Sequence, residues 1–182
     1  MQTDHNEDIV ESGPVLEMLT VAHEYCTFFE QAEKYRVTDI LEYFRKIAPL
    51  LYLKGSTLPE VAPGDDTFNE RFVTEEQWEG VFKNLRNKFG SQDVYYALDH
   101  NYDSVEASLA DNIADIYQDM KDFVMLFQKN HLHSRRNAIA QIRSLMAAHW
   151  GLTLINALGA VHHLVFKDQI DPDILQDDEW LF

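Results

Sequence analysis

The sequence predicts an all-α protein, a bundle of about five helices with a long C-terminal helix and a short acidic tail. Two observations support this prediction. Apolar residues recur at helical spacings of three and four in five segments, and capping residues, prolines or glycines bound these segments. The chain has 182 residues, 46% of them hydrophobic, which is enough to bury one sizeable core. One helical domain is therefore expected, over residues 14–166.

The first two helices are expected over residues 14–35 and 38–58. Pro14 suits the first turn of a helix, where a backbone N–H has no partner to lose. Pro49 lies inside the second segment. Because an interior proline removes a hydrogen bond and clashes with the preceding turn, we expect a kink or a break there. The acidic segment 1–13 is predicted to be disordered.

The third helix is predicted to begin after Thr74, which forms a capping box with Gln77, and to end at Gly90. Residues 59–72 are rich in Pro, Gly and Asp and should form the longest irregular connection. Residues 91–107 lack helical periodicity. They are interpreted as a connector, in which the run VYYAL could be a short extended piece.

The last two helices are expected over residues 108–129 and 134–166, as antiparallel neighbours joined by a short link. At 1.5 Å per residue the final helix would be about 50 Å long, against about 33 Å for the fourth. It must therefore overhang its neighbour or bend. Gly151 and Gly159 are the positions where a bend or a close helix approach is expected.

Composition limits the partners and the compartment. The formal net charge of −16 excludes a nonspecific grip on nucleic acid or an anionic membrane, and it would steer in a basic protein partner, unless it only maintains solubility. The lone Cys26 permits no internal disulfide and no Cys-based zinc site. The first residues do not form a signal peptide, and no stretch approaches the length of a membrane span. We expect a cytoplasmic protein, monomeric or homodimeric.

Four aspartates form a ridge along the flank of the fourth helix. Like charges spaced by four destabilise a helix by roughly 0.2–0.5 kcal/mol per pair, so this aspartate ridge requires compensation. Water, Arg or Lys from a neighbouring element, or a weakly held Mg²⁺ or Ca²⁺ could provide it. The ridge consists of Asp111, Asp115, Asp119 and Asp122.

A polar line runs along the last helix, where His149, Asn156 and His163 follow one another at spacings of seven. If buried, these side chains require hydrogen-bond partners, so we predict that His149 and Asn156 are mostly buried and hydrogen-bonded. They are either core residues that fix helix register or a polar pocket between the first, fourth and fifth helices, in which a neutral histidine acts as base or ligand. This candidate pocket would also include Asp111, Asp115 and Asp119.

A basic cluster stands at the start of the last helix, and a helix N-terminus favours anions. The cluster could bind a phosphate or carboxylate, or it could simply neutralise nearby acidic residues. Its candidate anion-binding residues are Lys129, Arg135 and Arg136. The chain lacks Glu-x-x-His and His-Glu-x-x-His metal motifs and a Gly-rich phosphate loop, so no cofactor and no tightly bound metal are expected.

The acidic-aromatic tail, residues 167–182, is predicted to dock. Pro172 prevents simple continuation of the last helix, and several large apolar side chains follow it. Leaving each of these in water would forgo roughly 1.5–3 kcal/mol. The dock is either the protein's own bundle, which we favour, or a second copy or partner. The apolar residues are Ile174, Leu175, Trp180, Leu181 and Phe182.

Four runs, in order, resemble a family of uncharacterised bacterial all-helical proteins known only as a domain of unknown function. They are AHEYCTFFEQA, LEYFRKIAPLLYLK, EASLADNIADIYQDMKDF and WGLTLINALGAVHHLVF. The resemblance implies a bacterial cytoplasmic helical bundle and transfers no activity, cofactor or catalytic residue. The predicted function is a protein-interaction or accessory helical module, and the alternative is a small-molecule-binding protein or an enzyme that uses the candidate pocket.

Overall fold

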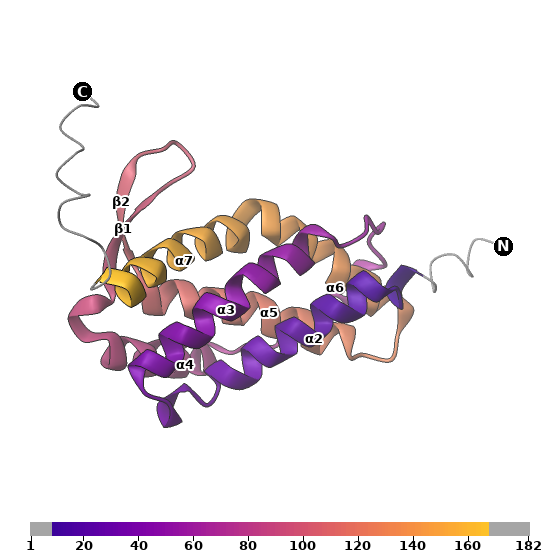
Figure 1. Ribbon diagram of the computed structural model, residues 1–182. Helices are drawn as coiled ribbons and strands as arrows, with labels where there is room; N and C mark the ends of the chain where they lie inside the picture. The colour runs from indigo at the N-terminus through magenta and orange to yellow at the C-terminus, as the bar shows by residue number, and fades with distance from the viewer. Residues whose placement is uncertain (1–8, 168–182) are drawn as a thin grey trace.

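The computed structural model describes residues 9–167, which fold into five helices and one two-stranded antiparallel sheet (Figure 1). The elements, in chain order, are α2 (Gly13–Phe29), α3 (Val37–Ser56), α4 (Glu75–Phe89), β1 (Val94–Leu98), β2 (Ser104–Ser108), α5 (Leu109–Phe127), α6 (Leu132–Leu145) and α7 (Gly151–Phe166). A π-helical segment, Met146–Trp150, joins α6 to α7, so the two form one long C-terminal helix. The predicted helical bundle is confirmed.

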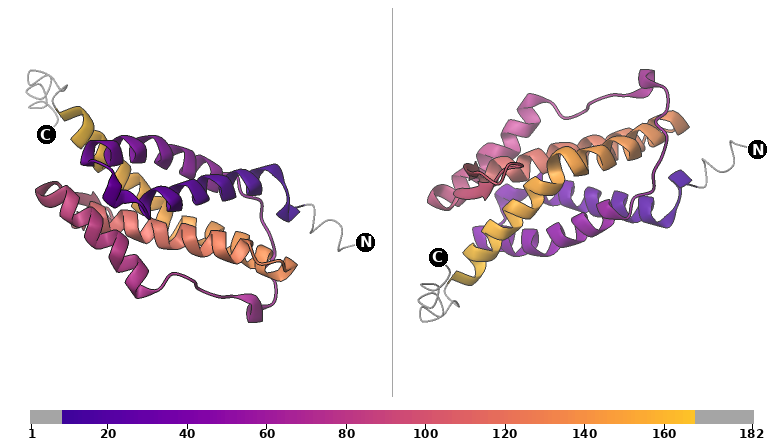
Figure 2. Two further views of the ribbon diagram at one scale, coloured as in Figure 1. Left: turned by 90° about the horizontal axis from the view of Figure 1, so that it is seen from below. Right: turned by 90° about the horizontal axis from the view of Figure 1, so that it is seen from above.

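Helix α5 is the centre of the bundle. It packs against α2, α4, α6 and α7, and in both views of Figure 2 it lies between α4 on one side and the α2–α3 pair on the other. Its apolar stripe has the helical spacing expected from the sequence, and the stripe is almost completely buried. The fully buried members of that stripe are Leu109, Ile113, Ile116 and Met120.

The long C-terminal helix bends at the π-helical segment, and Figure 2 shows α6 and α7 running in different directions. The segment is followed directly by Gly151, one of the two glycines expected to permit a bend. A Cβ atom at Gly151 would lie 2.3 Å from the carbonyl oxygen of Met146. The buried Trp150 fits against α3, where a Cβ on Gly55 would lie 2.4 Å from the indole ring. Glycine is therefore required at both contacts.

Three boundaries differ from the predictions. The first helix ends at Phe29 rather than near residue 35, and a 3₁₀ turn, Ala32–Lys34, follows it. No break occurs at Pro49, because α3 is helical on both sides of it. Residues 9–13 belong to the ordered bundle, since Val10 is only 1% exposed. The predicted disorder of segment 1–13 is therefore wrong for residues 9–13, and residues 1–8 lie outside the described residues.

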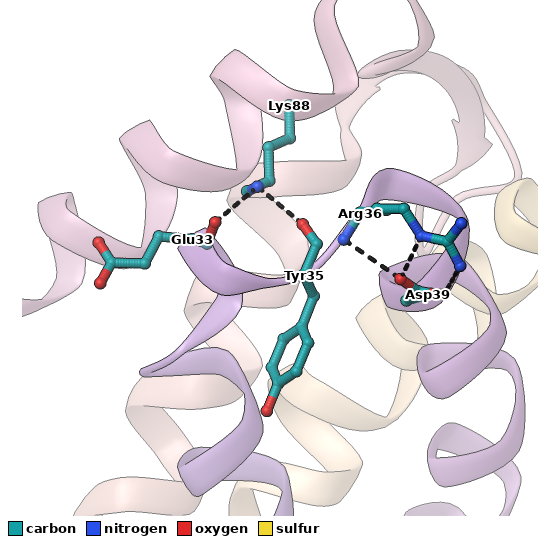
Figure 3. A network of polar contacts seen from close by, with 5 residues as sticks. All are labelled: Glu33, Tyr35, Arg36, Asp39 and Lys88. Atoms are coloured by element: carbon teal, nitrogen blue, oxygen red, sulfur yellow. Dashed lines mark hydrogen bonds and ion pairs between the residues drawn. The ribbon is translucent and has the colours of Figure 1, made fainter.

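The turn between α2 and α3 is held by α4 (Figure 3). The ammonium of Lys88 donates hydrogen bonds to the carbonyl oxygens of Glu33 and Tyr35, at 3.0 and 2.8 Å. The guanidinium of Arg36 donates two 2.8 Å bonds to the carboxylate of Asp39 at the start of α3. Carbonyl groups that a helix end leaves without partners are satisfied in this way, and the C-terminal end of α4 is fixed against the turn.

The predicted capping box of α4 is present, because the Thr74 hydroxyl accepts from the Gln77 N–H and the Gln77 side chain accepts from the Thr74 N–H. In the expected connector 91–107, the run VYYAL is strand β1, so the extended piece is confirmed. It pairs with β2 in a β-hairpin that projects from the bundle beside α7 (Figure 1). Asp93 ties this hairpin to α5. Its carboxylate, 1% exposed, accepts hydrogen bonds from the Ser108 hydroxyl and the Ala110 N–H at 2.7 and 2.8 Å.

Candidate functional site

A groove of about 600 Å³ lies between the hairpin and α7. One wall is strand β1 and the other is the face of α7 that carries Ile155, Gly159 and Leu164. The amide of Asn156 crosses between the two walls and donates a 3.1 Å hydrogen bond to the carbonyl of Leu98. Most of the lining is apolar. The remaining lining residues are Ser91, Gln92, Val94, Tyr95, Tyr96, Ala97, Ala160, His163 and Lys167.

The outer edge of β1 points into this groove. In an antiparallel pair, alternate residues direct both backbone polar groups to the partner strand, and the others direct them away. Asp99 donates a 3.0 Å bond to the carbonyl of Asp103 across the hairpin, so the odd-numbered residues of β1 face β2. The backbone groups of Val94, Tyr96 and Leu98 therefore face outward, and the Asn156 bond to Leu98 lies on that edge.

The groove leaves large apolar side chains exposed to solvent. Tyr96 is 73% exposed, Leu98 50% and Ile155 48%. A Cβ atom on Gly159 would meet no atom within 4 Å, so the α7 wall has free space beside it. Although the chain carries 31 acidic residues, the groove lining contains no carboxylate and includes the potential cations His163 and Lys167. The local chemistry is apolar and neutral to basic, unlike that of the whole protein.

A second polar cluster lies where the π-helical segment meets α5. The Nδ1 of His149 is 2.7 Å from a carboxylate oxygen of Asp119, and its Nε2 is 3.8 Å from one of Asp115. Asp119 is mostly buried, whereas the His149 side chain is 41% exposed. The indole N–H of Trp78 in α4 donates a 2.9 Å bond to the other oxygen of Asp115. The cluster thus connects α4, α5 and the C-terminal helix.

The two carboxylates keep His149 protonated. Asp115 and Asp119 raise the pKa of His149 from 6.5 to about 10, against the opposing effect of burial. At neutral pH the ring is an imidazolium with both nitrogens directed at carboxylates, so it is not available to accept a proton from a substrate. This arrangement does not provide the neutral histidine that the enzyme hypothesis requires.

The candidate pocket does not form as one cavity. His149, Asp115 and Asp119 meet at the polar cluster, while Asn156 and His163 line the groove. Helix α2 contributes no residue to the groove; the β-hairpin takes the place expected for it. His149 and Asn156 are hydrogen-bonded as predicted, but both are only partly buried, so the prediction of burial is wrong.

Protein groups compensate much of the aspartate ridge. Asp115 and Asp119 make the contacts described above. The carboxylate of Asp122 accepts hydrogen bonds of 2.7 and 3.0 Å from the backbone N–H groups of Phe72 and Val73. Burial, followed by the charge of Asp115, raises the pKa of Asp111. Within residues 9–167 no group of three or more His, Cys, Asp or Glu side chains is arranged to hold a metal ion. The ridge therefore joins α5 to its neighbours.

The basic cluster contacts other parts of the chain and does not converge on one anion site. Lys129 lies 3.3 Å from the carboxylate of Glu70 and Arg135 lies 3.1 Å from that of Glu11. The Arg136 guanidinium donates a 2.9 Å bond to the carbonyl of Ala62. Lys129 and Arg136 thus hold the long connection between α3 and α4, and Arg135 reaches a residue just before α2.

One helix of the bundle, Leu132–Phe166, is long and apolar enough to cross a membrane on length and composition alone, with a mean hydropathy of 1.3 over its most apolar window. The expectation that no stretch approaches this length is therefore wrong. In the fold this helix packs against α3 and α5 and carries the hydrogen-bonded groups described above. About 28% of that window is buried inside the bundle, and one helix of this length and composition is by itself weak evidence for a membrane span.

Comparisons with known proteins agree with the fold. A family model described as "Domain of unknown function (DUF5063)" matches residues 10–167. The chain is also similar to protein BF1032 from Bacteroides fragilis, whose crystal structure matches with a TM-score of 0.79 and 33% sequence identity, over 86% of this chain and 94% of that one. No curated protein matches. Neither similarity carries an assigned function, and the resemblance expected from the sequence is confirmed: the chain belongs to the DUF5063 family, a domain of unknown function.

Proposed function

We propose that the protein is an interaction module that binds an extended segment of a partner protein in the groove between β1 and α7. The observation that supports this most directly is the outer edge of β1, whose backbone groups face an apolar, partly exposed face of α7. An extended peptide can add to such an edge as a further strand. Its main chain then supplies affinity, and alternate side chains supply specificity.

The shape of the groove favours a peptide over a compact small molecule. Strand β1 has five residues, about 17 Å of extended chain. Along this length the backbone of Tyr96 offers a donor and an acceptor at the middle, while Asn156 marks one end and His163 lies further along α7. Polar groups repeated along an extended edge suit a chain that carries matching groups at the same interval.

The charge of the groove favours a partner segment that is apolar and neutral or acidic. Its lining contains His163 and Lys167 and no carboxylate. A basic partner, expected from the net charge of −16, would be steered towards the acidic remainder of the surface and not into this groove. We propose that binding takes place in the cytoplasm of a bacterial cell.

Selection of random short peptides displayed on phage against the full-length protein tests this function. Selected peptides should be apolar, neutral or acidic, and sensitive to two variants. Gly159→Leu places a side chain in the groove, and Tyr96→Pro removes an outward N–H from an edge strand, where proline is tolerated. Each should weaken binding on the order of tenfold or more, which is about 1.4 kcal/mol.

Two variants serve as matched controls. Gly80 lies in α4, away from the groove, and a Cβ there also meets no atom within 4 Å, so Gly80→Leu makes the same chemical change elsewhere. Tyr96→Ala removes the side chain but keeps the backbone N–H. Gly80→Leu should leave binding unchanged, and Tyr96→Ala should weaken it less than Tyr96→Pro. Selected peptides that bind Gly159→Leu as tightly as the wild type would contradict the proposed site.

A further inference from the structure

We infer that residues 168–182 of the same chain occupy the groove when no partner is bound, so that the tail competes with partner segments. This inference rests on the proposed function, because it assigns the tail to the same site. It also specifies the dock for the tail, whose residues lie outside the described part of the structure. Three observations support it: where the tail starts, how far it can reach, and what it carries.

The tail starts at the groove itself. Helix α7 ends at Phe166, and the next residue, Lys167, lines the groove. The fifteen residues from 168 to 182 can span up to about 50 Å when extended, at 3.3–3.6 Å per residue. Strand β1 is about 17 Å long. The tail can therefore turn after α7 and run beside β1 with residues to spare.

The composition of the tail matches the lining of the groove. The sequence DQIDPDILQDDEWLF combines large apolar side chains with acidic ones. The apolar residues suit the surface formed by Leu98, Ile155 and Leu164, and the carboxylates suit a lining that contains His163 and Lys167 without any acidic group. Six of the 31 acidic residues belong to the tail, and residues 1–167 still carry 25 acidic against 15 basic residues, a net charge of −10. On most other faces the same tail would therefore meet like charge.

Because the tail is part of the same chain, even a weak interaction with the groove is enough to keep the groove occupied. A segment attached directly to the end of a groove has an effective concentration in the millimolar range. A tail whose free peptide bound with a dissociation constant of about 0.1 mM would therefore occupy the groove most of the time. A partner segment must displace the tail. The apparent affinity for the partner is therefore the intrinsic affinity multiplied by the fraction of molecules whose groove is open.

Hydrogen exchange of the full-length protein, measured by mass spectrometry with fragments that cover β1, tests the inference. A tail that adds to the edge would protect the outward N–H of Tyr96. Replacing Ile174, Leu175 and Trp180 together by Ser should then raise the exchange rate of Tyr96 on the order of tenfold. Gly159→Leu should do the same, whereas Gln176→Ser, a polar change in the tail, should not.

The same variants separate this inference from the proposed function. If the tail occupies the groove, the variant with three serines should bind a phage-selected peptide about tenfold more tightly than the wild type. Equal exchange and equal peptide affinity in the two proteins would overturn the inference and leave the peptide site standing. Protection of Tyr96 that disappears on dilution would also overturn it, because the tail of a second copy would then fill the groove.

Discussion

Replacing His149 by Gln should lower stability in a way that depends on pH. The carboxylates of Asp115 and Asp119 raise the pKa of His149 from 6.5 to about 10, which corresponds to at most about 5 kcal/mol of stabilisation. The side chain is 41% exposed, so solvent screening reduces this to about 1–2 kcal/mol. Because the pKa is raised in the folded state, the contribution is complete below pH 6.5. It decreases as the pH rises and is lost at about pH 10.

Urea denaturation of the wild type and His149→Gln at a series of pH values measures this effect. The variant should be less stable by about 1–2 kcal/mol at pH 6, and the difference should shrink towards pH 10. Groups that titrate in both proteins cancel in the difference. His23→Gln, an exposed change on α2, should show no such trend. A difference between wild type and His149→Gln that stays constant from pH 6 to pH 10 would refute the ion-pair explanation.

Three further predictions concern the bundle. Gly151→Ala should cost about 1–3 kcal/mol in thermal or urea denaturation, since its Cβ would lie 2.3 Å from the Met146 carbonyl; an unchanged midpoint would contradict the close approach. Asp93→Ala should cost about 1–3 kcal/mol in the same measurement, because it leaves the buried Ala110 N–H without its acceptor. The buried thiol of Cys26, whose pKa is raised by burial, should react with iodoacetamide only on unfolding, and rapid labelling of the folded protein would contradict its burial.

Much of the fold could be predicted because helix boundaries leave local signals. These signals can be recognised in the sequence without knowledge of distant contacts. The Thr74–Gln77 capping box and Ser108 mark the starts of α4 and α5, and Gly90 marks the end of α4, all as predicted. The hairpin was harder to predict. Its strands are short and neither has a continuous buried face, so alternation of apolar and polar residues is weak. The groove depends on this hairpin and could not be found from helical periodicity.

The aspartate ridge shows what a local pattern leaves undetermined. The spacing of its aspartates indicated correctly that the repulsion between their like charges had to be compensated. The groups that compensate Asp115, Asp119 and Asp122 are an imidazole 30 positions beyond Asp119, an indole N–H in α4 and two backbone N–H groups. None of these is a Lys or Arg, and none lies at a fixed spacing from the ridge. A charged pattern therefore reveals that a partner is needed, while the packing of neighbouring elements decides which partner it is.

The residues of the polar line do not line one pocket, because the π-helical segment interrupts the helix between them. Spacing by seven places residues on nearly one face only while the helix keeps 3.6 residues per turn. A π-helical insertion adds one residue to a turn, which rotates everything beyond it by about 100° relative to an uninterrupted α-helix. His149 lies inside the segment and faces α5, whereas Asn156 and His163 lie beyond it and line the groove. The residues that share a period in the sequence are thereby divided between a cluster that stabilises the bundle and a groove available for binding.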